Sequence, residues 1–179
     1  MRDDFATEVA RAGDDDDLRA IVREVCELTG MGFAAVACVT QDRWITCQVA
    51  DRVAFGLDPG DELEVQTTIC DELRQCGNAI VIDEVRADPA WRTHHTPALY
   101  GFESYASFPV TLADGTFFGT LCAIDSAPRT LTAPATMDHL RRLATRAGEI
   151  LSARMQSSLK GRLTGTAPGE ACARRPAGR

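Results

Sequence analysis

Long hydrophobic runs are missing from this sequence. The longest apolar stretches, such as Phe33 to Val39, fall far short of the roughly 20 residues that a membrane-spanning helix needs. The N-terminus, Met1-Arg2-Asp3-Asp4, lacks the hydrophobic core of a secretory signal. We therefore expect a cytoplasmic protein that is neither exported nor inserted in a membrane.

Positive charge is also scarce. The formal net charge is −7, and Lys160 is the only lysine. A surface that reads nucleic-acid phosphates needs a basic stripe, and none is visible before the C-terminal tail. The sequence thus argues against a nucleic-acid partner.

Familiar catalytic motifs are absent as well. The sequence contains no phosphate-binding loop, no Cys-x-x-Cys, no His-Glu-x-x-His and no Ser-His-Asp order. The sequence contains 7 cysteines, an odd number, and shows no export signal. Both observations indicate reduced thiols rather than a disulfide framework. These absences favour a protein that is not an enzyme.

The N-terminal half contains helical and strand-like patterns. Acids at 14–17 precede apolar positions from Leu18 to Leu28 at helical spacing, where carboxylates suit the positive end of a helix. Residues 33–40 and 44–50 resemble two strands joined by the polar turn 41–43, which predicts a hairpin. Thr68 and Asp71 match a capping box that would open a short helix ending at Gly77.

The second half continues with a short strand at 79–82, an irregular segment at 86–100 and another hairpin, 104–112 with 116–125, joined through Asp114-Gly115. We expect the segment 86–100 to be an ordered loop with short helical turns. Asp83 and Asp125 end strands beside turns, where such acids fix the turn backbone.

A final helix is predicted over 135–159, followed by a disordered tail at 160–179 that is rich in Gly, Pro, Ala and Arg. Two hairpins flanking the strand at 79–82, with terminal helices on one face, make an α+β domain. We place the acidic N-terminal segment at 1–17 and the domain with its helices at 18–159.

Residues of the second hairpin carry a family resemblance. Ser107-Phe108-Pro109-Val110, followed by the run Phe117 to Asp125, looks like the terminal strands of GAF domains. Thr68 to Asp71, Val81 to Asp83 and His95-Thr96-Pro97 with Tyr100-Gly101-Phe102 resemble GAF regions of bacterial sensor kinases and cyclases. The resemblance covers about residues 18–151. It implies a PAS-related central antiparallel sheet, helices on one face and a loop-lined pocket on the other.

Such a pocket is expected to be mostly apolar with a few polar anchors. The candidate ligand-binding residues are Trp91, His94, His95, Tyr100, Phe102, Tyr105 and Cys70. Capping or surface roles stay open for the two histidines. No metal ligands or catalytic residues are predicted, and the identity of any cofactor or ligand is not determined by these residues.

The family offers more specific chemistries that this sequence matches poorly. Covalent bilin attachment commonly uses a cysteine directly before a histidine, and no such pair occurs. Methionine sulfoxide reductases of this family need closely grouped cysteines, which the spacing of Cys70, Cys76 and Cys122 does not reproduce. The cyclic-nucleotide signature would need a lysine within the domain, and Lys160 lies outside it.

The resemblance implies a sensing or regulatory module that binds a small molecule. Two hypotheses stay open: a stand-alone sensor that acts on a separate signalling protein, or a fragment of a longer protein. Because the stretch from Ile150 to Leu159 extends past any sheet edge in this interpretation, we expect a homodimer formed through the terminal helices. A dimerisation scaffold without a ligand and a thiol-based methionine sulfoxide reductase are the alternatives.

Overall fold

The computed structural model describes residues 3–155. Its elements are α1 (Asp4–Gly13), α2 (Asp16–Thr29), β1 (Phe33–Val39), β2 (Trp44–Asp51), β3 (Glu62–Leu63), η1 (Val65–Thr67), α3 (Ile69–Cys76), β4 (Ile80–Ile82), η2 (Val85–Ala87), α4 (His95–Tyr100), β5 (Ser104–Thr111), β6 (Phe117–Asp125) and α5 (Pro134–Arg154). The predicted tail at 160–179 lies outside the described residues.

The strands form one antiparallel sheet in the order β3-β2-β1-β6-β5-β4. Both predicted hairpins are confirmed, β1 with β2 and β5 with β6. The placement of β4 between them was wrong. The hairpins pair directly through β1 and β6, and β4 lies at an edge beside β5. The reason is length, since its 3 residues cannot carry a central ladder between strands of 7 to 9 residues.

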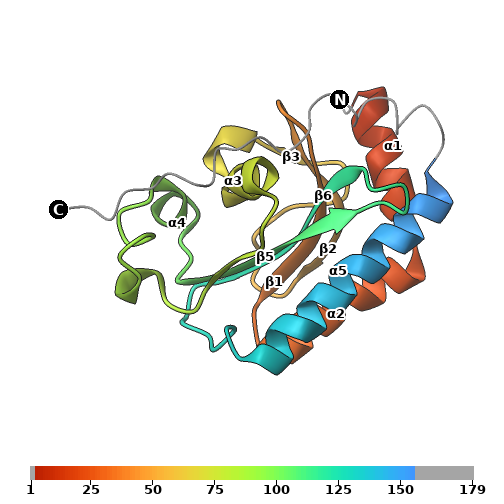
Figure 1. Cartoon of the computed structure of the whole chain (residues 1–179). Helices are drawn as coiled ribbons and strands as arrows, with labels where there is room; N and C mark the ends of the chain where they lie inside the picture. The colour runs from red at the N-terminus through yellow and green to blue at the C-terminus, as the bar shows by residue number, and fades with distance from the viewer. Residues whose placement is uncertain (1–2, 156–179) are drawn as a thin grey trace.

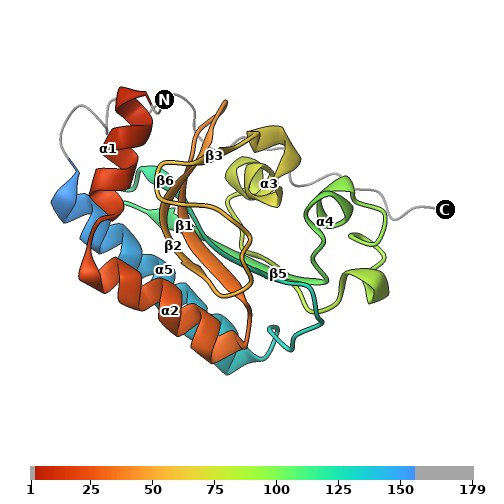
Figure 2. The same cartoon turned by 180° about the vertical axis from the view of Figure 1, so that it is seen from behind.

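Alternation along β1 assigns its side chains to two separate cores. Ala34, Val36 and Cys38 face the larger core under the helices. Phe33, Ala35 and Ala37 face a second core on the opposite side of the sheet. Figures 1 and 2 show the same division, with α1, α2 and α5 on one side of the sheet and α3 and α4 on the other. The predicted α+β layering is confirmed.

Helix α2 begins as the acidic run predicts. Asp15 is its N-cap residue and accepts hydrogen bonds from the backbone N–H groups of Asp17 at 2.9 Å and Leu18 at 3.2 Å. Gly30 ends the helix in the left-handed conformation, φ 71°, which suits a residue without Cβ. The helix therefore places Leu18, Ile21 and Val22 in the core.

The sequence interpretation missed helix α1, which lies within the segment described only as acidic. Phe5, Ala6, Val9 and Ala12 are buried on its inner face against the larger core. Their spacing is a helical periodicity that could have revealed the helix, but the surrounding charges obscured it.

Helix α5 is shorter than predicted and ends at Arg154, because Met155 has extended backbone angles. Its last turns do not project past the sheet. Leu151 is fully buried, and Ile150 and Met155 pack against the larger core. The residue that holds this end is Arg154, whose guanidinium donates to the carbonyl oxygens of Ala12 at 3.0 Å and Asp14 at 2.8 Å. The rest of the predicted helix, up to Leu159, lies outside the described residues.

Candidate functional site

The second core encloses a small cavity between the sheet and the segments that cover it. We call those segments the lid: the loop 52–61, the span from η1 through α3, and residues 83–103. The sheet supplies one wall and the lid the other. The lining residues are Phe33, Trp44, Phe55, Leu57, Leu63, Thr68, Ile69, Cys70, Thr96, Tyr100, Phe102, Tyr105, Cys122 and Ile124. The cavity has a volume of about 40 Å³.

Four of the seven predicted site residues line this cavity: Cys70, Tyr100, Phe102 and Tyr105. The rings of Phe102 and Tyr105 stack at 5.5 Å between centroids. Tyr100 lies on the outer side, with its ring 6.0 Å from that of Phe55, which in turn lies 4.8 Å from Phe33. All of these aromatic residues line the cavity.

The other three predicted residues do not line the cavity. His94 is the N-cap residue of α4, where its Nδ1 accepts from the Thr96 N–H at 3.2 Å. The ring hydrogen therefore lies on Nε2, which donates to Glu72 Oε1 at 2.6 Å. Trp91 packs beside His94, 5.2 Å between ring centroids, at the margin of the second core. The capping alternative thus describes His94.

His95 is exposed, and its ring stacks on that of His94 at 4.5 Å between centroids and an interplanar angle of 27°. The two rings can lie together because His94 precedes the first residue of α4 and has extended backbone angles. Within residues 3–155 no cluster of His, Cys, Asp and Glu has the arrangement of a metal site.

Hydrogen bonds join two of the three lid segments, the span from η1 through α3 and residues 83–103. Thr96 Oγ1 donates to the carbonyl oxygen of Thr67 at 2.8 Å, and the hydroxyls of Thr67 and Tyr100 lie 2.6 Å apart. We call these two contacts the latch. The predicted capping box at Thr68 was wrong, because the Thr68 hydroxyl donates to the Val65 carbonyl at 2.8 Å instead of capping α3. The preceding turn η1 offers that acceptor locally.

Two of the lining residues are cysteines, Cys70 and Cys122. The Cys70 sulfur lies 3.2 Å from the Tyr105 hydroxyl and accepts from Thr120 Oγ1 at 3.3 Å. Cys122 faces Cys70, and its hydrogen bond is the largest cause that lowers the pKa of the Cys70 thiol. Burial opposes this effect, while Thr120, Tyr105 and Trp44 lower the pKa further. The pKa of Cys122 is raised by the same partner and by burial.

The sequence spacing did not reveal this pairing of cysteines. Cys122 is opposite Ala35 on one neighbouring strand and Ser107 on the other, so the sheet register places it under α3. Cys76 is elsewhere, near the end of α3. Asp71, which follows Cys70 in α3, is paired with Arg74 at 2.9 Å.

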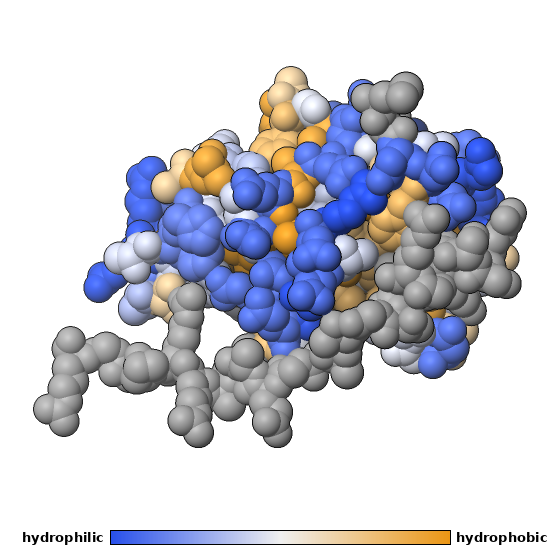
Figure 3. Space-filling view, turned by 90° about the horizontal axis from the view of Figure 1, so that it is seen from above, coloured by the Kyte–Doolittle hydropathy of each residue, from blue (hydrophilic) through white to orange (hydrophobic). Residues whose placement is uncertain are grey.

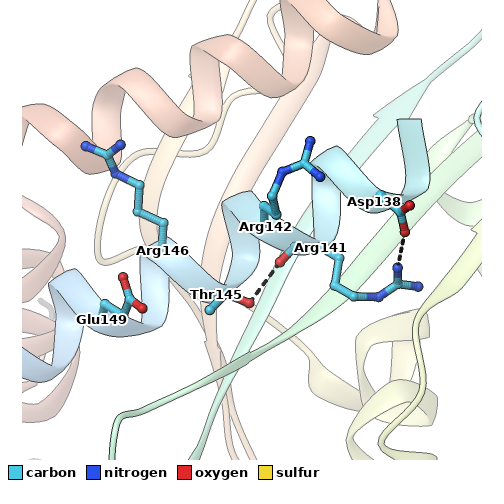
Figure 4. A pocket seen from close by; sticks show the side chains of 6 residues that line it. All are labelled: Asp138, Arg141, Arg142, Thr145, Arg146 and Glu149. Atoms are coloured by element: carbon cyan, nitrogen blue, oxygen red, sulfur yellow. Dashed lines mark hydrogen bonds and ion pairs between the residues drawn. The ribbon is translucent and has the colours of Figure 1, made fainter. Parts of the chain in front are cut away.

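A second hollow lies along the outside of α5 and is lined by Asp138, Arg141, Arg142, Thr145, Arg146 and Glu149 (Figure 4). All six residues are exposed and belong to this one helix. Ligand sites are concave and mostly apolar, whereas this surface is charged and walled on a single side. The cavity between sheet and lid is therefore the better candidate.

Comparison with solved structures gives matches of low sequence identity. The GAF domain of PixJ from Thermosynechococcus elongatus, in its blue-light absorbing form, has a TM-score of 0.61 at 12% identity, covering 82% of this chain and 88% of that one. A type II free methionine-R-sulfoxide reductase from Thermoplasma acidophilum has a TM-score of 0.59 at 9% identity, covering 85% and 98%. A far-red absorbing protein with bound biliverdin IXα has a TM-score of 0.59 at 14% identity, covering 74% and 86%.

These likenesses establish the fold. No curated protein sequence matches the chain. The sequence pattern of the GAF domain, in contrast, matches residues 15–151, which runs from the N-cap residue of α2 to the last buried leucine of α5. With the six-stranded sheet, its helical face and its lidded face in agreement, the chain belongs to the GAF domain family.

Proposed function

We propose that this GAF domain is a non-catalytic sensory or regulatory module whose ligand is a small, largely apolar molecule held between the sheet and the lid. The observation that carries the proposal is the apolar cavity lined from both layers. Structural relatives support it, since one is called a cyanobacteriochrome receptor and another contains biliverdin.

Ligand entry requires the lid to move. Pockets for drug-sized ligands measure about 300–1,000 Å³, and the cavity of about 40 Å³ is far smaller. The structure therefore represents a closed state. The latch stabilises that state, and a ligand that binds only the open state shifts the population toward it.

Lid movement offers a route for the signal. Helix α3 packs on the inner strands β5 and β6, whose opposite face supports α5. A ligand that displaces α3 would change the packing on β5 and β6, the strands that also contact α5. The output partner in this proposal is a separate signalling protein in the cytoplasm.

Thermal unfolding of the full chain tests the proposal with indole, coumarin, haem and biliverdin as probes of increasing size. A ligand of the folded state raises Tm with concentration. Tyr100→Phe removes one hydrogen bond of the latch, about 1 kcal/mol, and so favours the open state. Its apparent affinity for an active probe is expected to be about fivefold higher than that of the wild type.

Thr145→Val is the matched control, because it removes one hydroxyl that donates to the Arg141 carbonyl on the outer face of α5 (Figure 4). It should leave the affinity unchanged. A Tm that does not respond to any of the four probes, in the wild type and in Tyr100→Phe alike, would contradict the ligand proposal. That result would favour the scaffold without a ligand, which the small volume of the cavity also suits.

The reductase alternative has one observation in its favour, the pairing of Cys70 with Cys122. Turnover of free methionine sulfoxide by the wild type, lost in Cys70→Ser and retained in Cys76→Ser, would establish it over the non-catalytic proposal.

The dimer stays a prediction. The described part of α5 buries its apolar residues within the protein and presents charged side chains outward. On the face seen from above, hydrophobic residues show in separate areas among hydrophilic ones rather than as one broad surface (Figure 3). None of the helices in residues 3–155 combines the length and apolar character that a membrane crossing requires.

A further inference from the structure

The environment of Cys70 differs from that of the other buried cysteines. Cys38 lies in the larger core, and burial raises the pKa of its thiol to about 12. Burial also raises the pKa of Cys47. Cys70 is just as inaccessible, with 3% of the residue exposed, yet polar hydrogens surround its sulfur. Cys70 therefore differs from Cys38 and Cys47 in the polar groups around its sulfur and not in how deeply it is buried.

Several donors converge on this one sulfur. Thr120 donates at 3.3 Å, the Tyr105 hydroxyl lies at 3.2 Å and the Ser107 hydroxyl at 3.9 Å. The indole N–H of Trp44 lies near the same sulfur but reaches no acceptor at full hydrogen-bond geometry, although only 2% of the residue is exposed. A neutral thiol is a weak acceptor, whereas a thiolate accepts strongly from every donor.

An unpaired buried N–H costs about 1–3 kcal/mol, so the Trp44 indole indicates that this site is built for a stronger acceptor than a thiol. Cys70 is also the second residue of α3, where the helix dipole favours negative charge. The geometry thus stabilises a sulfur anion with neutral donors, and a second thiol, that of Cys122, faces it in the same cavity.

We propose that Cys70 is a site of oxidation by hydrogen peroxide and that Cys122 then closes a disulfide with it. The Cys70 thiolate attacks one peroxide oxygen, the O–O bond breaks, and the departing hydroxide takes up a proton to leave as water, giving a sulfenic acid. The Cys122 sulfur next attacks the Cys70 sulfur, and the hydroxyl leaves with the Cys122 proton as a second water. Two thiols lose two electrons, and one peroxide becomes two waters.

The cavity selects the size of the oxidant. Cys70 and Cys122 both line it, and one water needs about 10–15 Å³ of such space. A volume of about 40 Å³ therefore admits hydrogen peroxide and excludes bulky organic hydroperoxides and disulfides. The product would tie α3 of the lid to β6 of the sheet and hold the lid closed. The inference goes beyond the proposed function and does not depend on it.

The test uses the full chain, reduced and then freed of reductant. Hydrogen peroxide is added, remaining thiols are alkylated, and the peptides are mapped by mass spectrometry without reduction. We expect a disulfide between the Cys70 and Cys122 peptides, with Cys70 consumed at least about tenfold faster than Cys38. tert-Butyl hydroperoxide at the same concentration should react far more slowly.

Three variants separate the proposed roles of Cys122 and Thr120 from a general effect of removing a cysteine. Cys122→Ser should stop at a Cys70 sulfenic acid that dimedone traps, and Cys38→Ser should behave as the wild type. Thr120→Val removes one donor, so the rate of Cys70 oxidation should rise with pH at a higher midpoint than in the wild type. Circular dichroism checks that each variant is folded.

The proposal is overturned if Cys70 in the wild type reacts no faster than Cys38, or if Cys122 is linked to some other cysteine. Because this readout is a covalent bond and the ligand test is a shift in Tm, either proposal can fail while the other stands.

Discussion

Single carboxylates in this protein organise whole loops. Asp125 accepts from the Gly32 and Ala127 N–H groups, each at 2.8 Å, and so ties the start of β1 to the end of β6. Asp83 accepts from the Leu131 and Thr132 N–H groups at 2.8 and 3.1 Å. The predicted turn-fixing role is confirmed for Asp125, which accepts from Ala127 in the adjoining turn. It was wrong for Asp83, whose carboxylate binds the distant loop at 131–132 instead of its own turn.

Asp51 does the same for the lid. Its carboxylate accepts from the Val53 N–H at 3.0 Å and the Gly56 N–H at 2.9 Å, which positions the intervening Phe55 over the cavity. Burial raises the pKa of Asp51, but the backbone hydrogen bonds from Gly56, Phe55, Val53 and Ala54 outweigh burial and lower it overall. The ionised carboxylate is therefore the form that holds the loop.

We predict that Asp51→Asn lowers the free energy of unfolding by about 1 kcal/mol at pH 7, and that the loss depends on pH. A carboxylate whose pKa is lowered in the folded state contributes its full stabilisation of that state above its unfolded pKa, about 3.9. The contribution is lost as pH falls through the folded value. Urea titrations from pH 7 to pH 3 should therefore show the two proteins converging below about pH 4. A difference that stays constant over this range would contradict the role of the charge.

Close backbone contact between elements fixes how α5 lies on the sheet. Gly148 is buried against β5, and a Cβ built there would lie 2.0 Å from the carbonyl oxygen of Thr111. Ser152, one turn later, accepts from the Ala113 N–H at 2.8 Å. The helix therefore approaches the strand more closely than any side chain at position 148 would permit.

Gly148→Ala should consequently destabilise the protein by about 2 kcal/mol through overpacking, although the same change in an exposed helix stabilises by about 0.5–1 kcal/mol. The measurement is equilibrium denaturation of both proteins. Ala153→Gly, at an exposed position of the same helix, measures how much the difference in helix propensity between Ala and Gly alone changes the stability. A Gly148→Ala variant at least as stable as the wild type would show that α5 can move away from β5 without cost.

At the scale of the whole molecule, the sheet separates two cores with different tasks. The helical side is the larger and includes the fully buried Leu18, Leu140 and Leu151. The lidded side contains the cavity and is held partly by the latch, which is easier to open than a packed core. Under the proposed function, stability and ligand access therefore belong to opposite faces of one sheet.

A chain ending at Gly148 should lose at least about 3 kcal/mol of unfolding free energy, because removal of the buried Leu151 leaves a cavity and the Arg154 contacts to Ala12 and Asp14 are lost as well. A chain ending at Met155 is the control and should keep the stability of the full chain. Denaturation and solution mass are measured together. Unchanged stability with a halved mass would instead support a dimer formed by the end of α5.

Much of the architecture could be predicted because local periodicity records which face of an element is buried. The stripe from Leu18 to Leu28, the Asp114-Gly115 turn and the aperiodic segment 86–100 each depend on nearby residues, and each was interpreted correctly. Tyr100, Phe102 and Tyr105 were assigned to the cavity through the family resemblance, which implies a loop-lined pocket on one face of the sheet, and all three line it. The same argument failed for His94, which caps a helix that the sequence did not show.

Taken alone, the sequence determined the two hairpins, the helical and lidded faces, and the family. Tertiary structure decided that β1 and β6 meet, that α5 ends on α1 with Arg154 between them, and that the lid closes on a cavity of only about 40 Å³. It also decided that Cys70 meets Thr120, 50 residues away, beside Cys122. The physical reason is range: turns and periodic faces form from neighbouring residues, whereas strand order and convergent donors depend on contacts that only the packed chain creates.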